Sequence, residues 1–191
     1  MDVVDLVARV RDHFIEQFGS FVEQQQARFK LGSAEVKLEL DEDSAVFGGL
    51  YCVDFIRPVD DEEDEDDEDG VVEFDPAFFL QFEPASGAFG GMEVLIEQLH
   101  WHDIVIHHDL KSLPEDAIDD WFEAWFDPED ERFDPEARFA GVIHSLVIAD
   151  GKISIDFGTA HAAAFWDMLE LLEGAGATQV RIGSGDEEGE G

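Results

Sequence analysis

Residues 142–182 constrain the fold more than any other stretch, because every local signal in them agrees. Residues 142–148 are mostly apolar, residues 153–157 alternate apolar with polar side chains, and Asp150-Gly151 lies between the two runs. Such runs are typical of strands, and Asp-Gly is typical of a two-residue hairpin turn, which needs positive φ. This hairpin would pair Ile148 with Ile153, Leu146 with Ile155 and His144 with Phe157 on the buried face of a sheet.

A helix and a third strand are predicted after the hairpin. Thr159 is expected to cap the helix with its hydroxyl group. The apolar residues that follow recur at spacings of three and four, as on one face of a helix: Phe165, Trp166, Leu169 and Leu172. Gly174 and Gly176 would end the helix, and residues 178–182 alternate again as a strand. The C-terminal part therefore reads as a β-β-α-β unit whose helix covers the apolar face of the hairpin.

The remaining segments predict a long helix and further strands. Residues 3–29 carry the apolar stripe of an amphipathic helix. We predict a turn at 84–87, a short helix from Met92 to Leu99 and another helix opened by Ser112, as cap, and Pro114. Strands are predicted at residues 36–40, 50–56, 71–74 and 100–109.

We expect a single α+β domain over residues 1–183. Its sheet would be mainly antiparallel, with helices packed on one side. Residues 60–69 are all Asp or Glu and predict a flexible acidic loop at 60–70, and residues 184–191 predict a disordered acidic tail.

Charge is the strongest feature of the composition. The 48 Asp and Glu residues exceed the 11 Lys and Arg residues by 37. With the 14 acids of residues 60–69 and 186–190 set aside, 34 acids remain against 11 bases, a net charge of -23 for the body. Such a surface repels nucleic acid and anionic lipid, and it attracts basic proteins or divalent cations. We therefore expect neither direct nucleic-acid binding nor membrane binding.

Other sequence features favour a cytoplasmic protein. Cys52 is the single cysteine and lies in an apolar run, which predicts a buried thiol and no intramolecular disulfide. The N-terminal residues lack a basic segment followed by an apolar core, and no run reaches 18 apolar residues. Motifs for dinucleotides, P-loop phosphates, elbow serines and structural zinc are absent from the sequence.

A histidine-rich stretch is the first candidate site, for a metal ion. Its possible ligands are His100, His102, Asp103, His107, His108 and Asp109. On a strand that rises ~3.3 Å per residue, His102 and His108 would lie about 20 Å apart, too far to share one ion. A site would need either end of the stretch, completed by distant carboxylates. Histidines at strand ends or on a solvent-exposed face are the simpler interpretation.

A second candidate site combines His144 with His161, which the predicted register could bring together. A buried imidazole with a carboxylate partner can act as a general base. The sequence places no nucleophile beside this imidazole, however. The competing interpretation is a structural histidine in the core or at a corner of the fold. No cofactor is expected beyond loosely held divalent cations, since aligning Gly70 with the invariant glycine of an EF-hand places Pro76 at the twelfth ligand position.

Three functional hypotheses follow from these features. The first is a non-catalytic binding or regulatory protein that engages a basic protein partner, like an immunity protein, an antitoxin or a nucleic-acid mimic. The second is a metal-dependent enzyme that uses the His100–His108 cluster. The third is that the negative charge is an adaptation to a salty cytosol.

Overall fold

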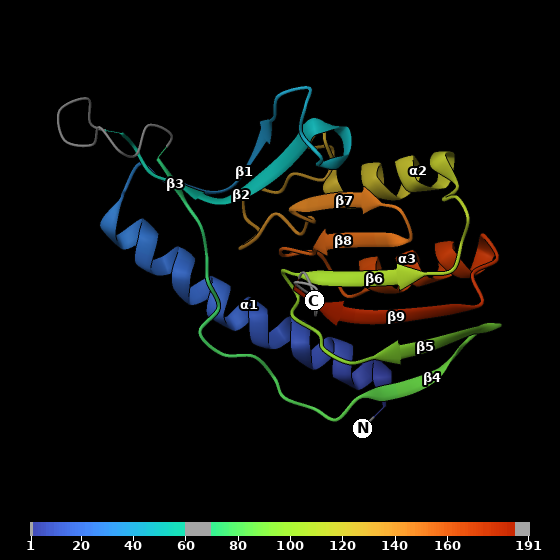
Figure 1. Ribbon diagram of the computed structural model, residues 1–191. Helices are drawn as coiled ribbons and strands as arrows, with labels where there is room; N and C mark the ends of the chain where they lie inside the picture. Colours follow the sequence, from blue (N-terminus) through green and yellow to red (C-terminus); the bar gives the residue numbers. More distant parts are fainter. Residues whose placement is uncertain (1, 60–69, 186–191) are drawn as a thin grey trace, which may run out of the picture.

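The computed structural model describes residues 2–59 and 70–185 and has an α+β fold (Figure 1). Residues 60–69 of the predicted acidic loop at 60–70 and residues 186–191 of the predicted tail lie outside the described residues. In chain order the elements are α1 (Val3–Arg28), β1 (Ser33–Glu39), η1 (Phe47–Gly49), β2 (Leu50–Ile56), β3 (Val71–Val72), β4 (Ala85–Phe89), β5 (Met92–Ile96), β6 (Ile104–His108), α2 (Glu115–Phe126), β7 (Ser145–Ala149), β8 (Lys152–Asp156), α3 (Ala163–Gly174) and β9 (Gln179–Ser184).

Two sheets form the framework. Sheet A is antiparallel with the order β1-β2-β3, and sheet B has the order β4-β5-β9-β6-β8-β7. Sheet B is mixed because β5 and β9 run parallel, while its other pairs are antiparallel. Helices α2 and α3 lie on one face of sheet B, and α1 runs past the ends of its strands (Figure 1). The opposite face of sheet B has no helix over it in this view.

The C-terminal unit has the predicted order β7, β8, α3 and β9. The hairpin turns at Asp150-Gly151, where Gly151 has φ 68°, and Ile148 and Leu146 pair with Ile153 and Ile155 as expected. Phe165 and Leu169 of α3 are fully buried against the sheet. The covering helix and two of the three predicted pairs are therefore confirmed; the third, His144 with Phe157, does not form, since β7 begins at Ser145 and His144 N donates to Asp156 O (2.8 Å).

The predicted helix from Met92 to Leu99 and the predicted turn at 84–87 are wrong. These residues form the hairpin of β4 and β5, in which Phe89 pairs with Met92. Gly90, with φ 57°, allows the two-residue turn between them. Met92, Val94 and Ile96 are buried at alternate positions, which is the two-residue period of a strand.

Several predicted boundaries also change. Helix α3 begins at Ala163, so Thr159 does not cap it, and α2 has Pro114 rather than Ser112 at its N-cap. Strand β6 begins only at Ile104, because residues 100–103 form a turn closed by the hydrogen bond from Asp103 N to His100 O (2.8 Å). Strand β9 extends to Ser184, the first residue of the predicted tail. No helix within residues 2–59 or 70–185 is long and apolar enough to cross a bilayer.

Candidate functional site

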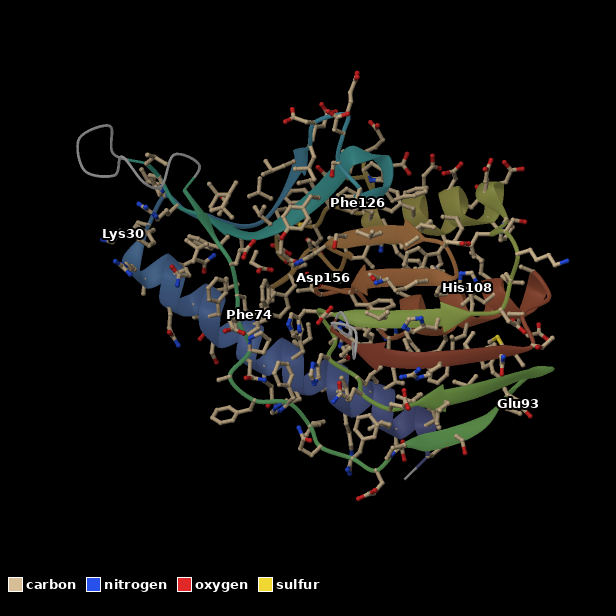
Figure 2. The ribbon with its side chains drawn as sticks, in the orientation of Figure 1. Lys30, Phe74, Glu93, His108, Phe126 and Asp156 are labelled. Carbon is tan, nitrogen blue, oxygen red and sulfur yellow. The ribbon has the colours of Figure 1, made fainter. Side chains whose placement is uncertain are left out.

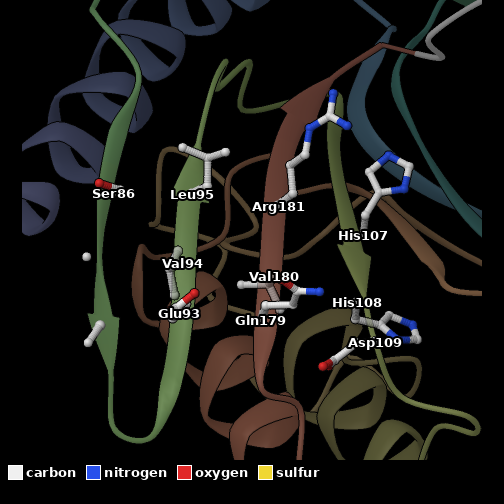
Figure 3. A pocket seen from close by; sticks show the side chains of 12 residues that line it. Ser86, Glu93, Val94, Leu95, His107, His108, Asp109, Gln179, Val180 and Arg181 are labelled. Atoms are coloured by element: carbon white, nitrogen blue, oxygen red, sulfur yellow. The ribbon is translucent and has the colours of Figure 1, made fainter.

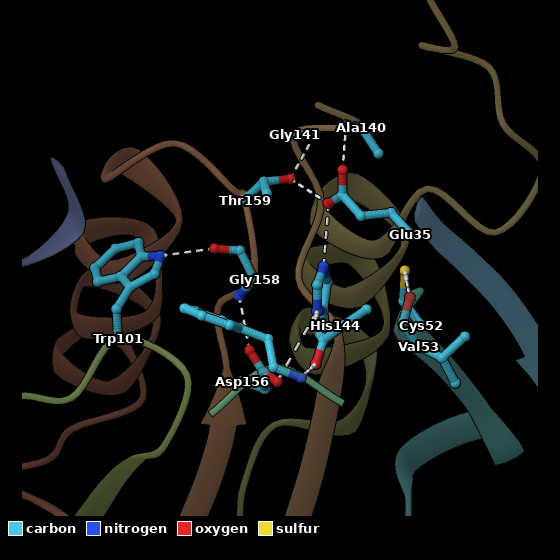
Figure 4. Close-up of polar contacts among 12 residues, drawn as sticks. Glu35, Cys52, Val53, Trp101, Ala140, Gly141, His144, Asp156, Gly158 and Thr159 are labelled. Carbon is cyan, nitrogen blue, oxygen red and sulfur yellow. Dashed lines mark hydrogen bonds and ion pairs between the residues drawn. The ribbon is translucent and has the colours of Figure 1, made fainter. Parts of the chain in front are cut away.

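A buried polar network centred on His144 joins the two sheets (Figure 4). His144 immediately precedes β7 and is only 1% exposed. Its Nδ1 atom lies 3.1 Å from Asp54 Oδ1 on β2, and its Nε2 atom lies 3.1 Å from Glu35 Oε1 on β1. Asp156 Oδ2, at the end of β8, is 4.0 Å from Nδ1. One imidazole from sheet B thus meets two carboxylates of sheet A and one of its own sheet.

The carboxylates of the His144 network have further hydrogen-bond donors. The Thr159 hydroxyl donates to Glu35 Oε1, which explains why Thr159 is not free to cap α3. Each carboxylate also accepts a bond from a backbone N–H: Glu35 from Ala140 (2.7 Å), Asp54 from Phe74 (2.8 Å) and Asp156 from Gly158 (2.8 Å). Buried charged groups need such partners to offset their loss of hydration.

The backbone is unusual at two positions of the network. Glu35 has φ 51° within β1, a conformation that is rare for residues other than glycine. Gly158 has φ 48°, and a Cβ atom added there would lie 2.2 Å from His144 Cδ2. Only glycine leaves room for the imidazole at this point. The chain is therefore shaped locally around the His144 ring.

The charge state of His144 follows from two opposing effects. Burial lowers the pKa of His144, but the Asp54 and Glu35 carboxylates that are hydrogen-bonded to the ring outweigh this effect, so the pKa is raised well above its ordinary value. Burial also raises the pKa of the Cys52 thiol, which is uncharged at neutral pH. The carboxylates are therefore the counter-charges that hold the imidazole protonated.

Asp156 is the network carboxylate that is nearest to solvent, with 21% of its side chain exposed. Protein atoms enclose the rest of it, and this burial raises the pKa of Asp156 to about 7, with the Asp54 charge adding to the effect and the His144 charge opposing it. Such a carboxyl group changes its protonation near neutral pH. The network therefore exchanges a proton in the physiological range.

Access limits what the network can do chemically. The side chains of His144 and Glu35 are 1% and 4% exposed, and Cys52 is fully buried. The general base predicted at His144 thus has carboxylate partners but no path to a substrate. His161 does not complete it, since His161 is exposed and its Nδ1 atom accepts a hydrogen bond from Ala163 N (3.1 Å) at the start of α3. The geometry is that of a polar connection between sheets.

The first half of the histidine-rich stretch packs against aromatic rings. The rings of His100 and Phe79 stack with centroids 3.9 Å apart, and His102 stacks on Phe14 at 5.9 Å. Burial lowers the pKa of both histidines, which keeps them neutral. Asp103 lies in the turn between them and β6. These histidines contribute packing at the junction of α1 and sheet B.

The second half of the stretch divides between the two faces of β6, as alternate strand residues must. Both ring nitrogens of His108 are buried and have no hydrogen-bond partner among the described residues, and burial lowers the pKa of His108. His107 lies on the other face, and Asp109 accepts hydrogen bonds from the backbone N (3.0 Å) and hydroxyl of Thr178. Within residues 2–59 and 70–185, no three His, Cys, Asp or Glu side chains are grouped so that they could hold a metal ion.

A shallow cavity of about 720 Å³ lies over strands β4, β5, β9 and β6 (Figure 3). The strand register aligns one row of side chains across this face: Ser86, Leu95, Arg181, His107 and, on β8, Lys152. Arg181 forms an ion pair with Glu97, so the row is not simply cationic. Sequence patterns did not predict this cavity, because it arises from the order of strands in the sheet.

The outer surface of α2 and α3 is predominantly acidic, with one basic group against it: Arg132 Nη2, from the segment after α2, donates to Ala124 O (2.7 Å), and the guanidinium lies 5.9 Å from the centroid of the Trp125 ring. Its acidic residues are Glu115, Asp116, Asp119, Asp120 and Glu123 on α2, and Asp167, Glu170 and Glu173 on α3. Neither helix contains a Lys, Arg or His residue. The apolar sides of both helices are buried, and carboxylate oxygens project from the solvent side of α2 (Figure 2).

Comparisons of the chain with models of protein families, with curated proteins and with solved structures found no match. The charge and geometry of the chain itself are therefore the basis for assigning a function.

Proposed function

We propose that this protein is a non-catalytic binding or regulatory protein that uses its acidic surface to engage a basic protein, in the manner of an immunity protein, an antitoxin or a nucleic-acid mimic. The observation that supports this is the α2–α3 surface, where the two helices contribute eight acidic residues and no basic residue of their own, against the single guanidinium of Arg132 beside Ala124. Charges of one sign on one surface steer an oppositely charged partner and accelerate its association.

The state of the titratable residues supports a binding role over catalysis. His144, which the sequence suggests as a general base, is buried between carboxylates at 3.1 Å on each ring nitrogen. A general base must reach the proton that it removes, directly or through one water molecule. The proposal includes a cytoplasmic location, which the free cysteine Cys52 supports because cysteines without a disulfide are typical of a reducing compartment.

The experiment compares two triple variants with equal net charge. One removes charge from α2 (Asp116→Asn, Asp119→Asn, Glu123→Gln), and the matched control removes it from the exposed side of α1 (Asp5→Asn, Asp12→Asn, Glu16→Gln). Each set contains one acid of a first helical turn, so the effects on helix stability are similar.

Binding is measured with the basic protein that the wild-type chain retains from its own cells at low salt. We expect the α2 variant to slow association several-fold and to flatten its salt dependence, with the control close to wild type. The proposal is wrong if no basic protein is retained, if the complex is insensitive to salt, or if both variants behave alike.

A further inference from the structure

Strand β4 is an open edge of sheet B. The other edge, β7, is covered, since Val147 forms a bridge with Val46 and Cys52 N donates to His144 O (2.8 Å) next to β7. The three central residues of β4, Ser86, Gly87 and Ala88, are exposed. In Figure 1 no element lies beyond β4 on the outer side of the hairpin.

The backbone of β4 offers unused hydrogen-bonding groups along this edge. Phe89 and Met92 flank a two-residue turn, so they form a hydrogen-bonded pair, as do Gly87 and Val94 two residues further on. Ser86 and Ala88 therefore direct their N–H and C=O groups away from β5. The hydrogen bonds of β5 fit this pattern: Glu93, which lies opposite Ala88, donates its N–H to Thr178 O (2.9 Å), on the side of β5 away from β4.

Edge strands of natural proteins are commonly protected by lysine, proline or a bulge within the strand. Residues 85–89 contain no charged residue and no proline, and the five pairs with β5 run without interruption. The stretch 84–92 is uncharged in a chain of which 31% of residues are charged. An edge of this kind is suited to pairing with another strand.

The side chains around β4 indicate the chemistry of the strand that would fit. Those of β4 on the cavity side, Ser86 and Ala88, are small, and Glu93 lies directly beyond Ala88 on β5 (Figure 3). A lysine on an added strand can extend over Ala88 towards the Glu93 carboxylate. Strands β4 and β5 and helix α3 contain no basic residue, and Glu173 of α3 accepts a hydrogen bond from Gly91 N (3.1 Å) at the turn.

We propose that the β4 edge binds an extended, basic segment of a partner protein as a seventh strand of sheet B. This inference rests on the proposed function, since it specifies how the basic partner is held. Backbone groups of Ser86 and Ala88 pair with the added strand, and a basic side chain of that strand extends over Ala88 to the Glu93 carboxylate. A second copy of this chain fits less well, because its own β4 carries no basic side chain and its charge is -37.

The probe is the peptide acetyl-Thr-Lys-Val-Lys-Val-Lys-Thr-amide. Its control is the same peptide N-methylated at its five central residues, which keeps every charge but cannot pair as a strand. In amide hydrogen exchange, Gly87 is expected to be protected in the free protein, while Ser86 and Ala88 exchange rapidly. The unmodified peptide should slow exchange at Ser86 and Ala88, and the methylated peptide should not.

Two pairs of variants test the same contacts by titration. Ala88→Pro removes the outward N–H without removing a bond to β5, and we expect peptide binding to weaken at least about tenfold, with Ala88→Ser close to wild type. Glu93→Gln should weaken binding several-fold, while Glu170→Gln on α3 should have a small effect.

The outcomes separate this proposal from the proposed function. If the peptide binds wild type and Ala88→Pro equally but loses affinity for the α2 triple variant, the β4 proposal is wrong and the acidic-surface proposal stands. If the peptide leaves Ser86 and Ala88 unprotected while a basic protein is still retained from cells, the β4 proposal is again wrong. A dimer in sedimentation that Ala88→Pro dissociates would identify a second copy as the occupant and overturn the assignment of a basic segment.

Discussion

Removing the imidazole of His144 should destabilise the protein strongly. In a His144→Leu variant, the Glu35 carboxylate, which is 4% exposed, and the Asp54 carboxylate, which is 14% exposed, both lose the cation that lies 3.1 Å away. Breaking a buried ion pair by removing one partner costs about 3–5 kcal/mol, because the other charge remains buried. We expect a loss in this range in the free energy of unfolding at pH 7.

A double-mutant cycle with Glu35→Gln tests the physical cause. If the loss comes from an unpaired charge, neutralising Glu35 should recover part of it, with a coupling energy of about 1–3 kcal/mol. The assay is urea unfolding with linear extrapolation, and His161→Leu, at an exposed histidine, is the control with an expected loss below about 1 kcal/mol. Additive losses, or a loss below about 1 kcal/mol for His144→Leu, would refute the reasoning.

The pH dependence of this loss has a definite sign. The pKa of His144 is raised in the folded state, so its protonation stabilises the fold fully below the unfolded pKa of about 6.5, and this contribution is lost as the pH rises through the folded pKa. The difference between wild type and His144→Leu should therefore narrow at alkaline pH. A difference that grows with pH would contradict the assignment of a buried imidazolium.

Three further predictions concern the same network and the surface charge. The pKa of Asp156 is raised to about 7, so the free energy of unfolding of wild type should fall by up to roughly 3 kcal/mol between pH 5 and pH 7. Urea unfolding at a series of pH values measures this change, and Asp156→Asn should make the free energy of unfolding less dependent on pH. Gly158→Ala should lower the free energy of unfolding by about 3 kcal/mol or more, because its Cβ would lie 2.2 Å from His144 Cδ2. The control is Gly174→Ala, which has no atom within 4 Å of its added Cβ and should leave thermal unfolding nearly unchanged. Raising NaCl from 0.05 to 1 M should increase the urea midpoint, because salt screens the repulsion among 48 acidic residues. A decrease in the midpoint would contradict the view that this repulsion lowers the stability of the fold.

The sequence predicted those parts of the fold in which one local period dominates. The stripe of α1 and the turn at Asp150-Gly151 left little ambiguity, and both elements lie where they were expected. The helix prediction for Met92 to Leu99 was wrong because the apolar residues of this segment fit both the helical period and the strand period. Met92 and Ile96 belong to both the helical and the alternating pattern, and only the turn at Gly90 distinguishes them.

The polar network could be predicted only in part. His144 was expected on the inner face, but its partners Asp54 and Glu35 lie 90 and 109 residues away in the chain, and no local pattern connects them. One signal was available, since Asp54 interrupts the apolar strand Leu50–Ile56 and a buried carboxylate requires a partner. The basic partner would have to be His, Lys or Arg, and the pairing of sheets that selects His144 is set by tertiary structure.

The network also explains how a chain with so much negative charge keeps two sheets together. Sheet A contributes two carboxylates to the contact and sheet B contributes the imidazole, so separating the sheets would leave like charges without their cation. The buried proton on His144 thus offsets, at one point, the repulsion that the rest of the surface maintains. With part of this internal negative charge offset by the imidazolium, the protein can present the carboxylates of α2 and α3 to solvent while its sheets stay in contact.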